Sequence, residues 1–219
     1  MNHEDLLKDP AIRKLLREFQ PNDILFKQGE HGSTLYIIIE GKIELHQKTA
    51  TLSRLVETVG PGEILGEKAV IFGGSYKRRL TAKAQTEVAV LEIDPMNWKW
   101  VLTRLPNFPV QMLRIVSIRL DRANELVGIL MLKEDLERIA HYLIYLCRHY
   151  GTKTSNGFEI SVNPEKTSAD TNCDLHRVQE FLAFLHRQGI LIPTGSRFLL
   201  TDEGALMAAL PQIREQLAA

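Results

Sequence analysis

The sequence predicts an α+β protein: an N-terminal antiparallel β-barrel or jelly roll, then a long helix, then a C-terminal winged helix-turn-helix. Three observations lead to this fold class. Short apolar segments divided by glycine turns fill residues 21–93, an apolar heptad pattern follows, and residues 135–200 run helix, strand, helix, hairpin. The predicted boundaries are 1–108 for the barrel, 109–133 for the long helix and 134–219 for the winged helix.

The composition is that of an ordinary globular protein, 44% hydrophobic and 25% charged. Lys+Arg and Asp+Glu are both 27, so a nucleic acid or an anionic membrane would have to meet a local patch. Cys147 and Cys173 fit neither a disulfide framework nor a metal-ligand spacing, so we expect a reducing cytoplasm and neither metal nor haem. Because no signal peptide or long apolar run is recognisable, we expect a cytoplasmic protein with no membrane partner.

The N-terminal third is expected to open with a short amphipathic helix at residues 4–18, broken near Pro10. Strand-like alternation then begins. The predicted strands lie within residues 23–29, 33–47, 53–59, 79–84 and 87–93. Glycines at the junctions supply the turns that many short antiparallel strands need.

The long helix carries an apolar seam. Leu113, Leu120 and Val127 are seven residues apart, and a second set lies three residues after each of them. This a/d pattern over about three heptads predicts a homodimer through residues 110–131. The alternative is a helix that packs only on its own barrel.

The last third begins with an amphipathic helix at 135–150 and a strand at 158–162. A second helix ends at Gly189, and two short strands flank a turn at Gly195. A final helix is expected over residues 202–217. Two helices followed by a hairpin are typical of a winged helix-turn-helix.

Several segments together resemble the Crp/Fnr family of bacterial regulators, over nearly the whole chain. The segments are GEHGSTLYIIIEGKIEL (29–45), GPGEILGE (60–67), RRLTAKAQTEVAVLEI (78–93), ELVG (125–128) and RIA (138–140). The resemblance implies a cyclic-nucleotide-binding sensor domain, a dimerisation helix and a DNA-binding-like domain. It implies a ligand-responsive homodimeric transcription regulator that binds double-stranded operator DNA, and not an enzyme.

The resemblance assigns effector-binding roles to particular residues. Arg78 matches the family's phosphate position and Glu67 its ribose position, while Gly66 lets the backbone approach the ligand. Asn124 falls where the family presents polar side chains to the base. The implied effector is small and anionic: cyclic AMP, cyclic GMP or a cyclic dinucleotide.

Two departures from the family pattern concern the ligand. Arg79 stands where the family usually has a small residue, and the interval from Glu67 to Arg78 is longer than usual, with Gly73-Gly74-Ser75 in the loop. Both favour either a more negative ligand, such as a cyclic dinucleotide, or no nucleotide. The alternative for Glu67 and Arg78 is a partly buried salt bridge that fixes the loop.

In the family register, Cys173 lies at the turn of the helix-turn-helix and Asp174 caps the recognition helix. The preceding helix has Thr167, Asp170 and Thr171 at its expected apolar positions. We therefore expect that helix to be short or irregular and to bury almost nothing.

The predicted DNA-contacting residues are polar side chains of the helix-turn-helix and the wing: Lys166, His176, Arg177, Gln179 and Arg197. Residues 135–219 hold eight basic and ten acidic side chains, so DNA affinity requires the basic ones to gather on one face. The alternative function is a cyclic-nucleotide-sensing or ligand-free interaction protein whose degenerate winged helix does not bind DNA.

Overall fold

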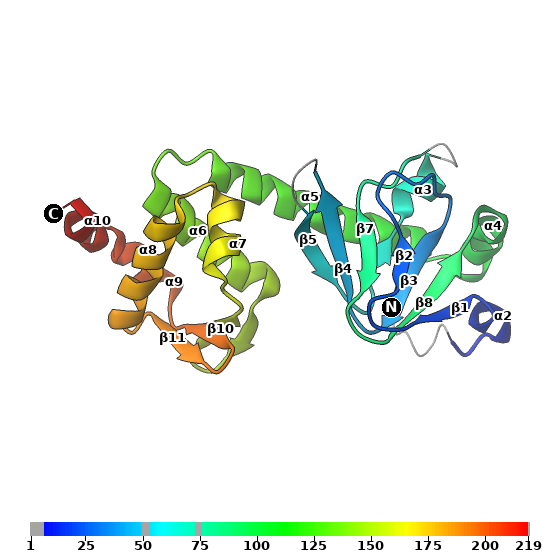
Figure 1. Cartoon of the computed structure of the whole chain (residues 1–219). Helices are drawn as coiled ribbons and strands as arrows, with labels where there is room; N and C mark the ends of the chain where they lie inside the picture. The colour runs from blue at the N-terminus through cyan, green and yellow to red at the C-terminus, as the bar shows by residue number, and fades with distance from the viewer. Residues whose placement is uncertain (1–6, 50–52, 73–75, 219) are drawn as a thin grey trace. The chain divides into compact units, whose positions relative to one another are not determined.

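The computed structural model describes residues 7–49, 53–72 and 76–218 (Figure 1). The chain divides into two units, Met1–Ser117 and Ile118–Ala219. The start of the predicted leading helix and the Gly73-Gly74-Ser75 loop lie outside the described residues.

The first unit contains two four-stranded antiparallel sheets, ordered β1-β8-β3-β6 and β2-β7-β4-β5. The strands of the first sheet are β1 (Leu16–Phe19), β8 (Val88–Ile93), β3 (Leu35–Glu40) and β6 (Ile64–Leu65). Those of the second are β2 (Ile24–Phe26), β7 (Thr81–Ala84), β4 (Ile43–Lys48) and β5 (Ser53–Val59). The predicted α+β class with an antiparallel N-terminal half is confirmed.

Strand β3 shows why its sequence, LYIIIE, is almost entirely apolar. Successive side chains of a strand point to opposite faces. Tyr36 and Ile38 pack with residues of the second sheet, whereas Leu35 and Ile37 pack on the other face with helical residues such as Val101. The first sheet is therefore buried on both faces, between the second sheet and helix α4 (Pro95–Arg104).

The predicted helix at residues 4–18 is wrong in its second half. Helix α2 spans only Pro10–Arg13, and strand β1 begins at Leu16. Leu16 pairs with Leu91 of β8, so this backbone takes its hydrogen bonds from the sheet ladder. Two helices that were not predicted also appear in the first unit, α4 and the short α3 (Glu67–Ile71).

Helix α5 (Phe108–Leu130) contains the boundary between the two units. Its first residue, Phe108, is 1% exposed and packs in the core of the first unit. The heptad residues, by contrast, are exposed: Leu113, Leu120 and Val127 have exposed fractions of 65%, 59% and 56%. These three side chains of the apolar seam are thus mostly exposed.

The second unit contains a four-stranded sheet and the remaining helices. Its elements are α6 (Asp135–Tyr150), β9 (Thr152–Thr154), β10 (Gly157–Ile160), α7 (Pro164–Thr171), α8 (Leu175–Arg187), β11 (Leu191–Thr194), β12 (Arg197–Leu200), α9 (Glu203–Ala208) and α10 (Leu210–Ala218). The sheet order is β11-β12-β10-β9, and α6, α8 and α9 share one apolar core with this sheet. This is the predicted winged helix-turn-helix.

The predicted final helix is divided in two. Helix α9 ends at its C-cap Ala209, and α10 begins at Leu210 with Pro211 in its first turn. Proline is tolerated in a first turn because the N–H group it lacks would have no partner inside the helix.

Helix α7 was predicted to be short or irregular and to bury almost nothing; the short length is confirmed, and the expected lack of burial is wrong. It is short but regular, and Thr167 and Thr171 are 1% and 0% exposed. Thr171 Oγ1 donates to Thr167 O at 2.7 Å, so its hydroxyl is satisfied inside the helix. With that bond made, the threonine can bury its methyl group as an apolar residue would.

Within the described ranges, no helix is both long enough and apolar enough to span a membrane.

Candidate effector site and helix-turn-helix

Arg78 lies on the segment that leads into β7, and its backbone is fixed on both sides. Its N–H donates to Glu30 O at 2.8 Å, and its carbonyl accepts from Gly29 N at 2.8 Å. The side chain is also held: Nη2 donates to Thr34 O at 2.7 Å, and the guanidinium carbon lies 4.3 Å from the ring centre of Phe26. Arg78 is only 6% exposed.

Two glycines make room for this guanidinium. A Cβ atom at Gly32 would lie 2.3 Å from Arg78 Nε, and one at Gly66 would lie 2.3 Å from Arg78 Nη1. Gly66 also has φ of +80°, in the left-handed region that favours glycine. Any larger residue at either position would displace the arginine from its place.

The buried guanidinium is incompletely satisfied. Within the described part of the chain, Nε and Nη1 of Arg78 have no hydrogen-bond partner. Burial lowers the pKa of Arg78, while the nearby Tyr36, Glu67, Glu30 and Tyr76 act in the opposite direction. Buried charged donors are costly unless an acceptor meets them, so the chemistry of this site fits an anionic ligand such as a phosphate.

Glu67 is the first residue of α3, and Gly66 is the N-cap of that helix. The structure therefore brings together three of the predicted effector residues, Gly66, Glu67 and Arg78. The other two are placed differently. Arg79 has an exposed side chain, and Asn124 is exposed on α5 in the second unit.

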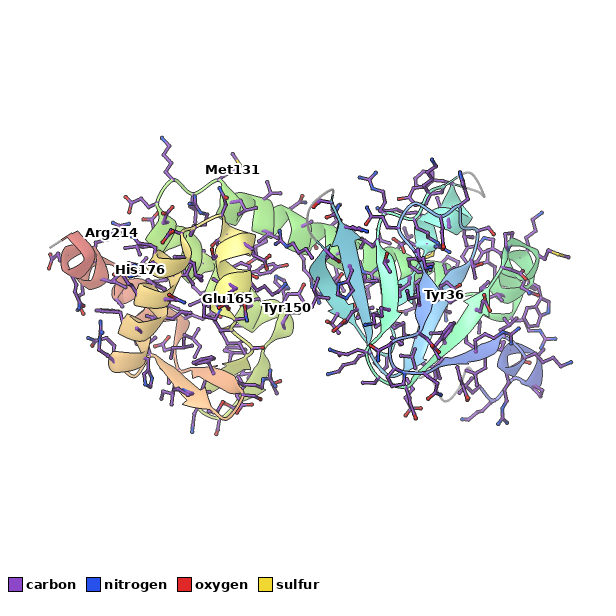
Figure 2. The ribbon with its side chains drawn as sticks, viewed as in Figure 1. Tyr36, Met131, Tyr150, Glu165, His176 and Arg214 are labelled. Carbon is purple, nitrogen blue, oxygen red and sulfur yellow. The ribbon has the colours of Figure 1, made fainter. Side chains whose placement is uncertain are left out.

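Residues that sequence reasoning missed complete the surroundings of Arg78. Phe26 stacks on Tyr36 with ring centres 6.0 Å apart, and Figure 2 labels Tyr36 on β3. Gly32 and Thr34 lie inside the family-like segment 29–45, so the segment was identified but not their roles. Thr34 acts through its backbone carbonyl, which leaves no signal in residue type.

The helix-turn-helix is closed by side-chain caps. Asn163 Oδ1 accepts from Lys166 N at 2.6 Å at the start of α7, and Asn172, with φ of +52°, ends that helix in the left-handed region. Asp174 Oδ1 accepts from the backbone N of His176 at 2.9 Å and of Arg177 at 3.2 Å. The predicted capping role of Asp174 is confirmed.

The predicted DNA-contacting residues on α8 lie in its first turns. His176 and Gln179 are exposed and Arg177 is half-buried, and His176 Nδ1 lies 3.5 Å from Glu180 Oε1. Figure 2 labels His176 on this helix. Their side chains are thus near the start of α8, where a recognition helix contacts base edges.

The other two predicted DNA contacts have partners within the unit. Lys166 Nζ lies 3.3 Å from Asp170 Oδ2, one helical turn away. Arg197 Nη2 donates to Glu159 O at 2.9 Å and Nη1 donates to Thr152 Oγ1 at 3.3 Å, so Arg197 ties the hairpin of β11 and β12 to β10 and β9. The sequence did not predict that Arg197 would hold these strands together.

No group of three or more His, Cys, Asp or Glu side chains suited to a metal occurs in the described parts of the chain. The second unit does contain a cavity of about 510 Å³, whose lining includes Glu125, His141 and Arg148. None of the predicted site residues lines this cavity.

Residues 16–104 match the family model of the cyclic nucleotide-binding domain. A CRP-like cAMP-activated global transcriptional regulator of Mycobacterium tuberculosis is 27% identical over 204 residues, covering 90% of each chain. The transcriptional regulator LdrP of Thermus thermophilus is 28% identical over 196 residues, covering 87% of this chain and 94% of LdrP.

Solved structures show the same fold. A CooA mutant from Carboxydothermus hydrogenoformans aligns with a TM-score of 0.73 at 18% identity, covering 95% of both chains. The c-di-GMP responsive global regulator CLP of Xanthomonas campestris aligns with a TM-score of 0.65 at 20% identity, covering 89% of this chain and 100% of CLP. The similarity therefore extends over both units.

Proposed function

Given that the chain belongs to the Crp/Fnr family of transcriptional regulators and carries a cyclic nucleotide-binding domain, we propose a specific function for it. It is a cytoplasmic homodimer, not an enzyme, that binds a cyclic nucleotide in its barrel and operator DNA with its winged helices. The observation that carries the proposal is the buried Arg78 guanidinium with two unpaired nitrogens, held between Gly32 and Gly66.

The effector's phosphate is assigned to Arg78. A phosphate oxygen can accept from Nε or Nη1, which removes the cost of a buried cationic donor without an acceptor. Glu67 would accept from the ribose hydroxyl, and Asn124 would meet the base. The M. tuberculosis relative is named as cAMP-activated, so cyclic AMP is the first candidate effector, ahead of cyclic GMP and a cyclic dinucleotide. Arg79, exposed beside the site, is available to the second phosphate of a dinucleotide.

The homodimer is assigned to α5, within residues 110–131. Its exposed apolar side chains continue from Leu113 to Val127 at heptad spacing. Apolar side chains at a/d positions are stabilised when a second helix covers them. A second copy of the chain offers the same seam and is the partner proposed.

DNA binding is assigned to the start of α8, with His176, Arg177 and Gln179 toward the major groove. Lys166 and Arg197 add positive charge near the phosphates, and Arg197 also positions the wing. The alternative of a degenerate module is not favoured, because α7 is a regular helix that buries Thr167 and Thr171.

The experiment that tests the proposal is selection of DNA from a random duplex library on the immobilised protein, with and without cyclic AMP. We expect cyclic AMP to enrich a two-fold symmetric sequence whose half-sites lie about one helical turn apart. Cyclic GMP and a cyclic dinucleotide serve as parallel arms. Absence of any enriched sequence in all arms would contradict the proposal.

A further inference from the structure

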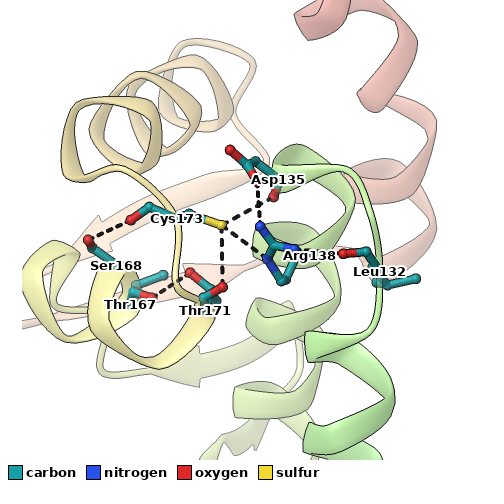
Figure 3. Close-up of polar contacts among 7 residues, drawn as sticks. All are labelled: Leu132, Asp135, Arg138, Thr167, Ser168, Thr171 and Cys173. Atoms are coloured by element: carbon teal, nitrogen blue, oxygen red, sulfur yellow. Dashed lines mark hydrogen bonds and ion pairs between the residues drawn. The ribbon is translucent and has the colours of Figure 1, made fainter.

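The side chain of Arg138 joins three parts of the second unit (Figure 3). Its Nη1 donates to Leu132 O at 2.6 Å, in the segment between α5 and α6. Its Nη2 donates to Asp135 Oδ1 at the start of α6, and its Nε donates to Cys173 Sγ at 3.4 Å, in the turn of the helix-turn-helix. With its side chain only 13% exposed, Arg138 has little freedom to make these contacts in another geometry.

Cys173 also has contacts that do not involve Arg138. Ser168 Oγ, on α7, donates to Cys173 O at 2.7 Å, and Cys173 Sγ lies 3.8 Å from Asp135 O (Figure 3). Cys173 itself is 6% exposed. The next residue, Asp174, is the N-cap of α8. The place of Cys173 therefore fixes where the recognition helix begins.

We infer that Arg138 is a positioning residue that couples the end of α5 to the recognition helix. The inference rests on the proposed function. If an effector displaces the segment at Leu132, the planar guanidinium must either move with the Leu132 carbonyl or break its bond to it. Since the same guanidinium contacts the turn at Cys173, the displacement reaches the start of α8. A lysine cannot replace Arg138, because one compact ammonium cannot span three acceptors in a fixed plane.

The test compares Arg138→Ala and Arg138→Lys with Arg214→Ala in the full chain. Arg214 is a matched control because it also binds carboxylates at the start of α6. Its Nη2 lies 2.6 Å from both Glu134 Oε2 and Glu137 Oε1, two residues close to Arg138 in the sequence. Among the described residues, Arg214 makes no hydrogen bond or ion pair with the turn at Cys173. Figure 2 labels Arg214 on α10.

The first readout is amide hydrogen exchange of a peptide spanning residues 168–180, without nucleotide or DNA. We expect exchange at the turn to be roughly ten-fold faster in Arg138→Ala, because charge-assisted hydrogen bonds that restrain local opening are lost. Arg138→Lys should also exchange faster, and Arg214→Ala should match the wild type. Unchanged exchange in Arg138→Ala would overturn the inference.

The second readout is the ratio of DNA affinities with and without cyclic AMP. In the wild type we expect cyclic AMP to raise DNA affinity by roughly 5- to 150-fold, the range found for coupled sites. In Arg138→Ala we expect this ratio to be below about two-fold, while the affinity for cyclic AMP itself is unchanged. A merely structural contact would lower the thermal midpoint and leave the ratio intact, which would also overturn the inference. If cyclic AMP does not change the DNA affinity of the wild type, both the proposed function and the coupling through Arg138 are refuted. The hydrogen-exchange measurement, which uses neither nucleotide nor DNA, still shows whether Arg138 restrains the turn.

Discussion

Gly32 and Arg78 are complementary in shape: a Cβ atom on Gly32 would lie 2.3 Å from Nε of Arg78. Their backbones belong to adjoining segments, since Gly32 N donates to Tyr76 O at 3.2 Å. The absence of a side chain at Gly32 is therefore what allows the guanidinium to occupy its buried position. The proposed effector site depends on this glycine as much as on the arginine.

Gly32→Ala should weaken cyclic AMP binding by about ten-fold or more, because the added methyl group displaces the Arg78 guanidinium. Gly60→Ala is the matched control. Its Cβ would meet nothing closer than Gly41 O at 3.9 Å, and neither Gly32 nor Gly60 has a φ that excludes alanine. Titration calorimetry of both variants measures the difference, and equal affinities would contradict the role of Gly32.

Leu120→Glu should dissociate the proposed homodimer, with a dissociation constant at least about a hundred-fold higher. A carboxylate at a buried seam position must be desolvated when the helices pair. Sedimentation velocity over a concentration series measures this. The control is Ile24→Glu on β2, where Ile24 is exposed at 45% but outside the seam. A dimer in Leu120→Glu as tight as in the control would refute the interface.

Cys147 should make the free energy of unfolding depend on pH in alkaline solution. Burial raises the pKa of its thiol from the usual 9.0 to about 12. Above pH 9 the thiol of the unfolded chain loses its proton while the thiol of the folded chain keeps it, which lowers the free energy of unfolding. The contribution of this thiol to stability is therefore fully present below pH 9 and is lost as pH rises toward 12.

Urea unfolding of the wild type and Cys147→Ala between pH 7 and about 11 isolates this contribution. The variant is expected to be less stable at pH 7 because it leaves a small cavity. The difference between the two proteins should shrink as pH rises. A difference independent of pH would show that the thiol does not titrate differently in the folded chain.

Gln179→Ala should relax the sequence preference of the proposed DNA interface at one position per half-site. Loss of a side chain that contacts a base edge costs about 1–3 kcal/mol of discrimination, whereas loss of a phosphate contact weakens all sequences alike. Comparison of enriched sequences for the wild type and the variant measures this. The control is Arg187→Ala, an exposed residue at the end of α8. Identical sequence preferences for wild type and Gln179→Ala would exclude base reading by Gln179.

The antiparallel strands, the helix at 135–150 and the terminal hairpin were predictable because alternation, amphipathic spacing and glycine turns act locally. Leu16 was misassigned to a helix because its apolar spacing with Ile12 fits a helix, whereas pairing with Leu91, distant in sequence, decides its structure. Thr167 and Thr171 were misjudged because residue type does not show that a hydroxyl can bond inside its own helix while the side chain is buried.

For the site, sequence reasoning located Gly66, Glu67 and Arg78 through family resemblance. It could not find Phe26, Gly32 or Thr34, because a ring face, a missing side chain and a backbone carbonyl around one guanidinium depend on the tertiary fold. Likewise, the contacts of Arg197 with Glu159 and Thr152 depend on how strands β12, β10 and β9 pair.

The unpaired Nε and Nη1 of Arg78 are proposed to bind the phosphate of an anionic effector. The most direct measurement is a calorimetric titration of the wild type and Arg78→Met with cyclic AMP, with the thermal midpoint of each protein recorded without ligand. We predict about one ligand per subunit for the wild type and binding weaker by at least roughly a hundred-fold in the variant. The unliganded variant should melt no lower than the wild type, because an apolar side chain of similar length replaces an incompletely satisfied buried charge. Equal cyclic AMP affinity in the two proteins would contradict the claim, as would no binding to the wild type.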